Sequence, residues 1–134
     1  MILGIGTDLC EISRIEKALE RFGERFAQRI LVPSELEVFR RRRKRASYLA
    51  KRFAAKEAFS KAMGTGIHSP VNWHNVWVVN NRAGAPALEF SKPLTNLLKR
   101  RGIKKVHITL TDEIGLACAF VIFEGTGRKS RPKR

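Results

Sequence analysis

One segment of the chain, residues 46–63, constrains the fold more than any other, because it predicts a long helix with an unusual face. Alanine recurs there at every fourth position, at Ala50, Ala54, Ala58 and Ala62. Residues four apart lie on the same side of a helix, so these alanines form a stripe without bulky side chains. Gly64 and Gly66 follow directly and predict the helix end. We therefore expect a long helix that packs closely against a neighbouring element.

The rest of the chain predicts shorter helices and strands around this helix. Ser13 with Glu16, and Ser34 with Glu37, have the spacing of capping boxes, so each pair predicts a helix start. Gly23 is expected to bend or end the first of these helices. The other predicted elements span residues 1–7, 73–79, 87–90, 93–101, 105–111 and 116–123. The order, β-ααα-ββ-α-ββ, predicts an α+β fold with a mainly antiparallel sheet packed against the long helix.

A chain of 134 residues with 43% hydrophobic residues can form one compact domain, expected over residues 1–124. Residues 125–134 contain five basic residues and no acidic one, and they predict a disordered basic tail. No apolar run approaches the roughly 20 residues of a membrane span, and the N-terminus lacks the features of a signal peptide. Cys10 and Cys118 have no spacing typical of a zinc site. We expect a cytoplasmic protein with reduced thiols and no membrane partner.

The charge balance is strongly basic, with 27 lysines and arginines against 12 acidic residues and a formal net charge of +15. Such a charge attracts polyanions or an acidic protein partner without identifying either. Residues 40–45, RRRRKR, are typical of a solvated face or a nonspecific patch. One interpretation is a small nucleic-acid-binding protein that uses residues 40–45 and the tail. Against it, the sequence has no RNP, KH or helix-turn-helix signature.

Asp8, Glu57 and Lys61 each allow two interpretations. Asp8 lies between a predicted strand and a predicted helix, where it can be a stabilising charge near a helix N-terminus or a metal ligand at the strand end. Glu57 stands four residues before Lys61, the favoured order for an intrahelical ion pair. Phe53 and the alanines, however, indicate a partly buried face, and a buried carboxylate needs a charged partner or a metal ion.

Taken together, these residues indicate phosphoryl-group chemistry. Mg²⁺ binds proteins through one or two carboxylates and completes its shell with water and substrate phosphate. A lysine beside one of the carboxylates can hold a further phosphate as a point charge. Asp8 and Glu57 for the metal and Lys61 for a phosphate, in basic surroundings, therefore suggest a phosphate-rich ligand.

Three stretches carry a family resemblance: GIGTDLCEISRIE near the N-terminus, RFAAKEAFSKAMGTGI in the middle and VHITLTDEIGLACAFVI near the end. In order and spacing, over residues 1–123, they resemble the holo-[acyl-carrier-protein] synthases, the small phosphopantetheinyl transferases. The resemblance implies the 4′-phosphopantetheinyl transferase fold. It also implies Mg²⁺-dependent transfer of 4′-phosphopantetheine from coenzyme A to a serine of apo acyl carrier protein, with release of adenosine 3′,5′-bisphosphate, in fatty acid biosynthesis.

The resemblance also implies roles for individual residues. Asp8 and Glu57 match the family's Mg²⁺ ligands, and Lys61 matches a lysine that meets a coenzyme A phosphate; these three are the expected catalytic residues. Gly64 and Gly66 match glycines where the backbone approaches the nucleotide. Family members are commonly homotrimers with coenzyme A at active sites between adjacent subunits. Their basic first helix docks the acidic carrier protein, and the matching residues here are Arg14, Arg21 and Arg25.

Asp112 departs from the pattern of many members, which have a histidine where this chain has an aspartate after Thr111. Another branch of the family carries Asp-Glu at this point, so membership is unaffected. Asp112 can position a water, touch the metal shell or cap the hairpin, and the turn preference of aspartate favours the last. His107, on the strand that leads to this point, is expected to be a satisfied strand residue rather than a catalyst. The sequence identifies no base for the serine proton.

Overall fold

The computed structural model describes residues 1–126, which form five helices and five strands. In chain order they are β1 (Ile2–Glu11), α1 (Ile12–Phe22), α2 (Glu24–Ile30), α3 (Pro33–Arg41), α4 (Arg45–Met63), β2 (Val76–Asn80), β3 (Pro86–Phe90), α5 (Lys92–Arg100), β4 (Ile103–Glu113) and β5 (Leu116–Gly125). Among these helices, none has the length and apolar character that crossing a membrane requires. The predicted tail lies outside the described residues, apart from Gly125, which ends β5, and Thr126.

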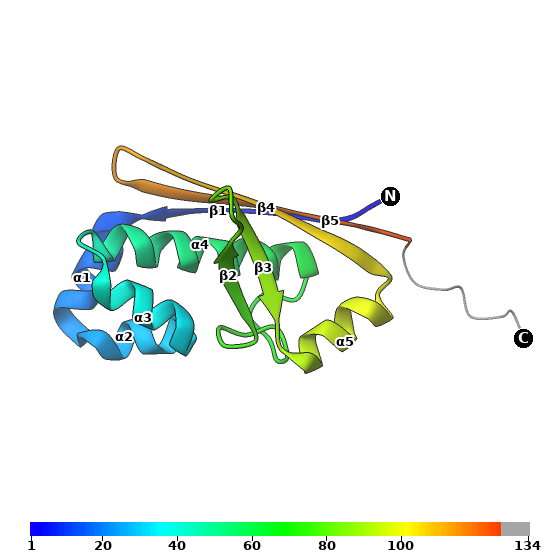
Figure 1. Cartoon of the computed structure of the whole chain (residues 1–134), viewed down its shortest axis with the longest axis horizontal. Helices are drawn as coiled ribbons and strands as arrows, with labels where there is room; N and C mark the ends of the chain where they lie inside the picture. The colour runs from blue at the N-terminus through cyan, green and yellow to red at the C-terminus, as the bar shows by residue number, and fades with distance from the viewer. Residues whose placement is uncertain (127–134) are drawn as a thin grey trace, which may run out of the picture.

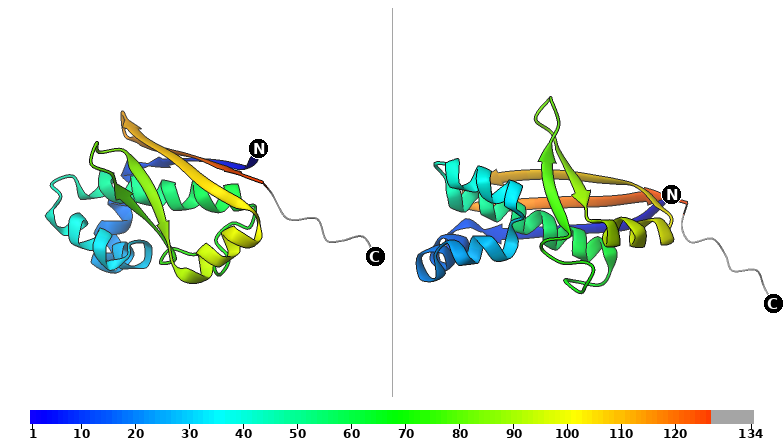
Figure 2. Two further views of the ribbon diagram at one scale, coloured as in Figure 1. Left: turned by 45° about the vertical axis from the view of Figure 1, so that its right-hand side comes forward. Right: turned by 60° about the horizontal axis from the view of Figure 1, so that its bottom comes forward.

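The strands form two antiparallel sheets, one of three strands in the order β1-β5-β4 and one made of β2 and β3. The long helix α4 lies along one face of the three-stranded sheet (Figure 1), and the hairpin β2–β3 stands beside it (Figure 2). The predicted α+β fold is therefore confirmed. The predicted order was wrong in one detail, because four helices separate β1 from β2. Gly23, at φ 66°, ends α1, and the residues after it form the separate helix α2.

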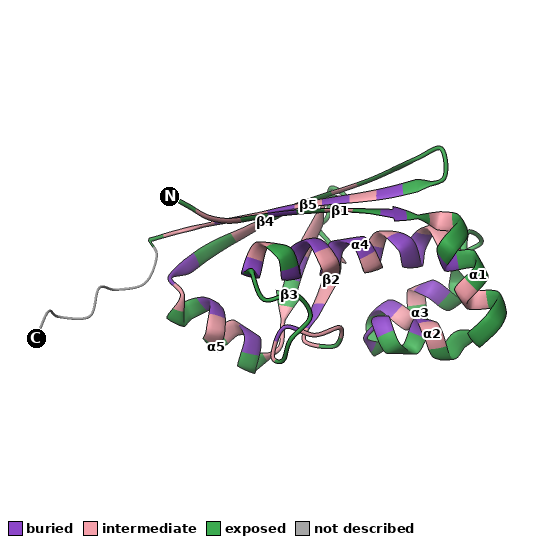
Figure 3. Ribbon diagram, turned by 180° about the vertical axis from the view of Figure 1, so that it is seen from behind, coloured by how far each residue is buried: buried purple, intermediate pink, exposed green. Residues whose placement is uncertain are grey.

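The core lies between α4 and the three-stranded sheet, where the buried positions of both elements face each other (Figure 3). On β5, every second residue points toward α4 and is buried, as alternation along a strand requires; these residues are Ala117, Ala119, Val121 and Phe123. The opposite face of the same sheet carries exposed apolar side chains of β1. Ile5 and Leu9 are 61% and 67% exposed.

The alanine stripe of α4 packs directly against the backbone of β1, so the predicted close approach is confirmed. Gly4 and Gly6 face this stripe, and neither position has room for a side chain. A Cβ atom at Gly4 would lie 2.5 Å from the carbonyl oxygen of Ala62, and one at Gly6 would overlap the carbonyl of Ala58. The glycines therefore fix the distance between strand and helix through main-chain contact.

Replacement of Gly6 by alanine is expected to lower the free energy of unfolding by about 1–3 kcal/mol, because the added methyl forces β1 and α4 apart. Urea unfolding followed by circular dichroism measures this change. Thr7→Ala, on the opposite face of the same strand, is the matched control and should have a smaller effect. Equal stability of Gly6→Ala and the wild type would contradict the close contact.

Both predicted capping boxes were wrong. α1 starts at Ile12, with Glu11 as its N-cap and no side-chain cap, because pairing with β5 continues along β1 as far as Glu11. α3 starts at Pro33, so its third residue is Glu35 rather than Glu37. The Glu35 carboxylate accepts a hydrogen bond from the backbone N–H of Val32 at 3.1 Å and so satisfies the helix start.

Glu35 also belongs to a fully buried ion pair that ties α4 to its neighbours. Lys56 Nζ lies 2.7 Å from Glu35 Oε1, and both side chains are almost completely inaccessible to solvent. The same ammonium donates to the carbonyls of Ile30 and Trp73, at 2.6 and 2.8 Å, and Glu35 Oε2 accepts from Val78 N–H at 3.0 Å. The Lys56 ammonium and both Glu35 carboxylate oxygens are hydrogen-bonded, so the pair fixes the position of α4 relative to α2, α3 and β2.

Candidate active site

Asp8 lies within β1 rather than at its end, and it faces α4. The strand continues to Glu11, so the interpretation of Asp8 as a charge near a helix N-terminus was wrong. Alternation along the strand puts Asp8 on the same face as Gly4 and Gly6. Its side chain is only 13% exposed. β1 therefore presents a largely buried carboxylate to the long helix.

Lys61 pairs with Asp8 and not, as the i,i+4 spacing predicted, with Glu57. Its Nζ atom lies 2.9 Å from Asp8 Oδ1 and 3.1 Å from the carbonyl oxygen of Thr7. The close packing of β1 on α4 brings these acceptors within reach of the lysine. One positive charge thus lies directly beside the Asp8 carboxylate, and Glu57 is left without an ion-pair partner among residues 1–126.

Glu57 is half-buried on α4 and close enough to Asp8 to feel its charge. Burial raises the pKa of the Glu57 carboxyl, the negative charge of Asp8 raises it further, and Lys61 only partly opposes both effects. Asp8 Oδ2 is buried and has no hydrogen-bond partner among the described residues 1–126. Two neighbouring carboxylates with one unsatisfied oxygen favour the binding of a cation, which would relieve both the repulsion and the missing contact.

The donor set suits a hard divalent cation that keeps part of its shell for other ligands. Within residues 1–126, no group of three or more histidine, cysteine, aspartate or glutamate side chains converges on a metal site. Asp8 and Glu57 would thus be the protein's two carboxylate ligands. This number is typical of Mg²⁺, which usually retains water and substrate phosphate. The structure brings Asp8, Glu57 and Lys61 together, and their roles as metal and phosphate ligands stay predictions.

Gly64 and Gly66 end α4 just beyond Lys61, as predicted. Both have the left-handed backbone conformation, at φ 77° and 64°, which favours glycine. Within residues 1–126, no atom beyond the immediately neighbouring chain lies within 4 Å of the Cβ position at either residue. The backbone of this turn is therefore open to a ligand.

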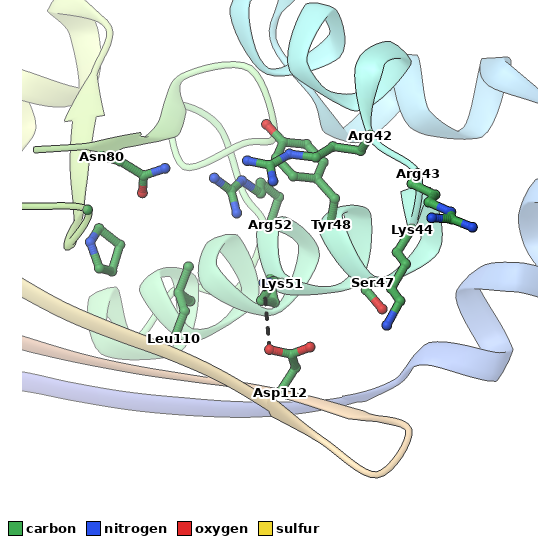
Figure 4. A pocket seen from close by; sticks show the side chains of 12 residues that line it. Arg42, Arg43, Lys44, Ser47, Tyr48, Lys51, Arg52, Asn80, Leu110 and Asp112 are labelled. Carbon is green, nitrogen blue, oxygen red and sulfur yellow. Dashed lines mark ion pairs between the residues drawn. The ribbon is translucent and has the colours of Figure 1, made fainter.

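A second charged region, which we call the basic cleft, lies on the other side of α4. It is a cleft of about 530 Å³ between the start of α4, the β2–β3 hairpin and the end of β4 (Figure 4). Its charged lining residues are Arg42, Arg43, Lys44, Lys51, Arg52 and Asp112. Sequence reasoning treated residues 40–45 as a nonspecific patch and missed this site. Lys51 and Arg52 complete it from the next turns of α4, seven or more residues after Lys44.

Arg52 is the most buried cation of the basic cleft. It is 7% exposed, and its guanidinium carbon lies 4.1 Å from the centre of the Tyr48 ring. Its Nε atom has no hydrogen-bond partner in the part of the chain that the structure describes. Because a nearly buried charge without a carboxylate partner is costly, Arg52 favours an anionic ligand in the basic cleft.

Asp112 is a residue of β4 and does not cap the hairpin, so the favoured prediction was wrong. It pairs in register with Ala117, and the turn itself consists of Ile114 and Gly115, both with positive φ. Asp112 Oδ1 lies 3.6 Å from Lys51 Nζ (Figure 4). His107 is a strand residue as predicted, and its Nε2 lies 3.0 Å from Glu124 Oε1.

The three arginines of the predicted docking surface are all exposed. Arg14 and Arg21 belong to α1, and the guanidinium of Arg21 lies over the ring of Phe22, 5.1 Å from its centre. Arg25 follows Gly23 and belongs to α2, so its assignment to the first helix was wrong. The basic surface therefore spans the junction of two helices.

Comparisons with known proteins agree over almost the whole chain. A family model described as the 4′-phosphopantetheinyl transferase superfamily matches residues 4–119. A holo-[acyl-carrier-protein] synthase from Nitrosospira multiformis is 48% identical over 124 residues, which are 92% of this chain and 99% of that protein.

Solved structures agree with the sequence comparison. The crystal structure of holo-[acyl-carrier-protein] synthase from Neisseria meningitidis has a TM-score of 0.89 and 44% identity, with 92% of this chain and 99% of that chain covered. A Bacillus anthracis holo-(acyl-carrier-protein) synthase in complex with CoA (3′,5′-ADP) has a TM-score of 0.78 and 37% identity, with 94% and 99% covered.

Proposed function

The chain belongs to the 4′-phosphopantetheinyl transferase superfamily, and from this membership we propose that it is a holo-[acyl-carrier-protein] synthase. It transfers 4′-phosphopantetheine from coenzyme A to a serine of apo acyl carrier protein, in fatty acid biosynthesis. The observation that carries the proposal is the proximity of the Asp8 and Glu57 carboxylates beside Lys61, where the buried Asp8 Oδ2 lacks a hydrogen-bond partner among residues 1–126. Membership also accounts for Arg42, Arg43 and Lys44, the members of the basic run 40–45 that line the basic cleft, without the alternative of nucleic-acid binding.

Asp8 and Glu57 are the residues that would hold Mg²⁺. When bound there, the ion would supply positive charge at the phosphate under attack. Lys61 keeps Asp8 oriented through the 2.9 Å ion pair and adds a further positive charge at the same place. In the transfer, the serine oxygen bonds to the phosphorus that carries pantetheine. The bond from that phosphorus to the bridging oxygen breaks, and adenosine 3′,5′-bisphosphate leaves with the electron pair. Positioning and electrostatics supply most of the rate enhancement.

The basic cleft is suited to the phosphate-rich end of coenzyme A. Five cationic side chains line it, and Tyr48 adds an aromatic surface at its wall. The unpartnered Nε of the nearly buried Arg52 supports an anionic ligand there. After transfer, the adenosine bisphosphate would keep its phosphates in the same cleft.

The positions of the two charged regions support an active site shared between subunits of a homotrimer. Asp8 lies on β1, at one edge of the three-stranded sheet, and the basic cleft includes Asp112 of β4, at the other edge. In a head-to-tail ring, the Asp8 side of one subunit meets the basic cleft of the next. The exposed apolar residues Ile5 and Leu9, on the sheet face turned away from α4, would be covered by such an assembly.

The transfer itself is tested by mass spectrometry of apo acyl carrier protein after incubation with the protein, Mg²⁺ and coenzyme A. The expected result is a gain of one phosphopantetheine group, which is lost when a chelator removes the metal. An unchanged carrier mass, together with salt-sensitive binding of RNA, would contradict the proposal and favour nucleic-acid binding.

Arg14→Glu is expected to weaken docking of the acidic carrier protein, because it reverses one charge of the exposed basic surface on α1. We expect KM for the carrier to rise about tenfold, whereas KM for coenzyme A should remain unchanged. Steady-state kinetics with each substrate varied in turn measure both constants. Arg100→Glu, an equally exposed charge reversal at the end of α5, is the matched control and should change neither constant. Equal losses for the two substrates would contradict docking on α1.

A further inference from the structure

Asp112 is the one carboxylate among the residues that line the basic cleft, which also has five cationic side chains in its lining. A negative charge in the wall of a phosphate-binding site repels the phosphate directly. The side chain nevertheless points into the cleft, toward Lys51 (Figure 4). The fold does not require it there, because 44% of the side chain is exposed and the turn is made by the two residues Ile114 and Gly115.

The register of β4 explains why Asp112 faces the cleft. Val106, Ile108 and Leu110 alternate toward α4, and Asp112 continues this row. Its neighbour Glu113 points to the opposite face and does not line the cleft. β4 thus carries two adjacent carboxylates, Asp112 and Glu113, and only Asp112 lies in the wall of the basic cleft.

The charge of the cleft creates a difficulty for product release. Adenosine 3′,5′-bisphosphate retains two phosphate groups after the transfer, and five cations, one of them the nearly buried Arg52, would hold it. Tight binding of the product lowers the turnover rate once release becomes slower than chemistry. A carboxylate that pairs with Lys51 at 3.6 Å cancels part of this attraction.

We propose that Asp112 weakens the hold of the basic cleft on the bisphosphate product and thereby permits its release. The carboxylate weakens product binding in two ways. It repels the phosphates directly, and it pairs with Lys51 and so reduces the attraction of Lys51 for them. This role rests on the proposed transferase function and adds a residue that sets the release step. Asp112 does not take part in bond formation.

Asp112→Asn tests the proposal, because it removes the charge and keeps the shape. Calorimetric titration with adenosine 3′,5′-bisphosphate should give a Kd about fivefold lower than that of the wild type. Steady-state kcat should fall by a similar factor, whereas the rate of a single turnover, measured with enzyme in excess, should remain unchanged. Glu113→Gln is the matched control and should leave the Kd unchanged. Thermal unfolding checks that both variants fold.

A double variant separates charge from geometry. Lys51→Met should raise the Kd, and Lys51→Met combined with Asp112→Asn should return it close to the wild-type value, because one charge of each sign is removed. Weaker binding by Asp112→Asn would show that the aspartate orients Lys51 for the phosphate and would overturn the proposal. A slower single turnover would likewise overturn it by placing Asp112 in the chemistry. Absence of transfer by the wild type would instead contradict the proposed function, whereas the binding measurements do not depend on turnover.

Discussion

Glu57→Gln is expected to reduce Mg²⁺-dependent transfer by about 10³-fold or more, since it removes one of the two carboxylates that would hold the metal. The substitution preserves the shape of the side chain, and Glu57 is only half-buried on the surface of α4. The loss should therefore concern catalysis and not the fold. Transfer rates measured across a Mg²⁺ titration give the size of the effect.

The same variant should be at least as stable as the wild type without metal. Burial and the charge of Asp8 raise the pKa of Glu57 in the folded protein, so its charged form is disfavoured there. A carboxyl with a raised pKa stabilises the fold below its unfolded pKa and loses this contribution as the pH rises through the folded pKa. At neutral pH, glutamine thus removes an unfavourable charge. Added Mg²⁺ should raise the Tm of the wild type and leave that of Glu57→Gln unchanged. Full activity of the variant would refute the metal assignment.

Mixing two inactive variants is expected to restore activity, because each variant damages a different side of the shared site. Glu57→Gln removes one of the two carboxylates that would hold the metal. A double variant with Arg43→Glu and Lys44→Glu reverses two charges in the basic cleft. Purification through both tags keeps only trimers that contain both variants, and in each of these about one interface in three combines the intact side of each variant. Co-expression with two affinity tags, followed by transfer assays on the doubly purified protein, measures the recovery.

Two controls make this experiment decisive. Each variant purified alone should be inactive, and light scattering should give the mass of a trimer for both. Doubly tagged protein without activity would mean that both halves of the site act within one chain. It would contradict an active site between subunits while leaving the transferase activity itself untouched.

The long helix and its local features could be predicted from the sequence, because their signals are local. Alanines at every fourth position and glycines after the last turn identify a helix with a bare face and a defined end. The contact of Asp8 with Lys61 joins residues 53 positions apart. Helical spacing could not predict it; Asp8 and Glu57 were grouped by the chemistry of two carboxylates for one cation, and the family resemblance supported that grouping.

Gly4 and Gly6 show why the end of β1 was misjudged. Glycine usually weakens a strand, so the sequence predicted a short one. In the structure these glycines allow the backbone of α4 to approach β1 closely. Pairing with β5 extends the strand to Glu11. The extension moves Asp8 from a strand end to a buried face.

The dipeptide Lys56-Glu57 shows a second limit of sequence reasoning. Nothing in the local pattern distinguishes a lysine that is fully buried from one that extends into solvent. Lys56 can be buried because its ammonium group is paired with Glu35, 21 positions away, and donates to two carbonyl groups of other segments. Its neighbour Glu57 has no such partners and remains available for a ligand.

The contact of β1 with α4 also bears on how freely this protein can change. Asp8 and Glu57 are held at their spacing by main chain against main chain, through Gly4, Gly6 and the alanines of the helix. Other core side chains, such as Leu94 and Leu98 of α5, lie away from this contact. Substitutions among these can alter the melting temperature without moving the two carboxylates relative to each other. Thermal robustness and metal affinity are therefore separable traits, which selection or an engineer can adjust one at a time.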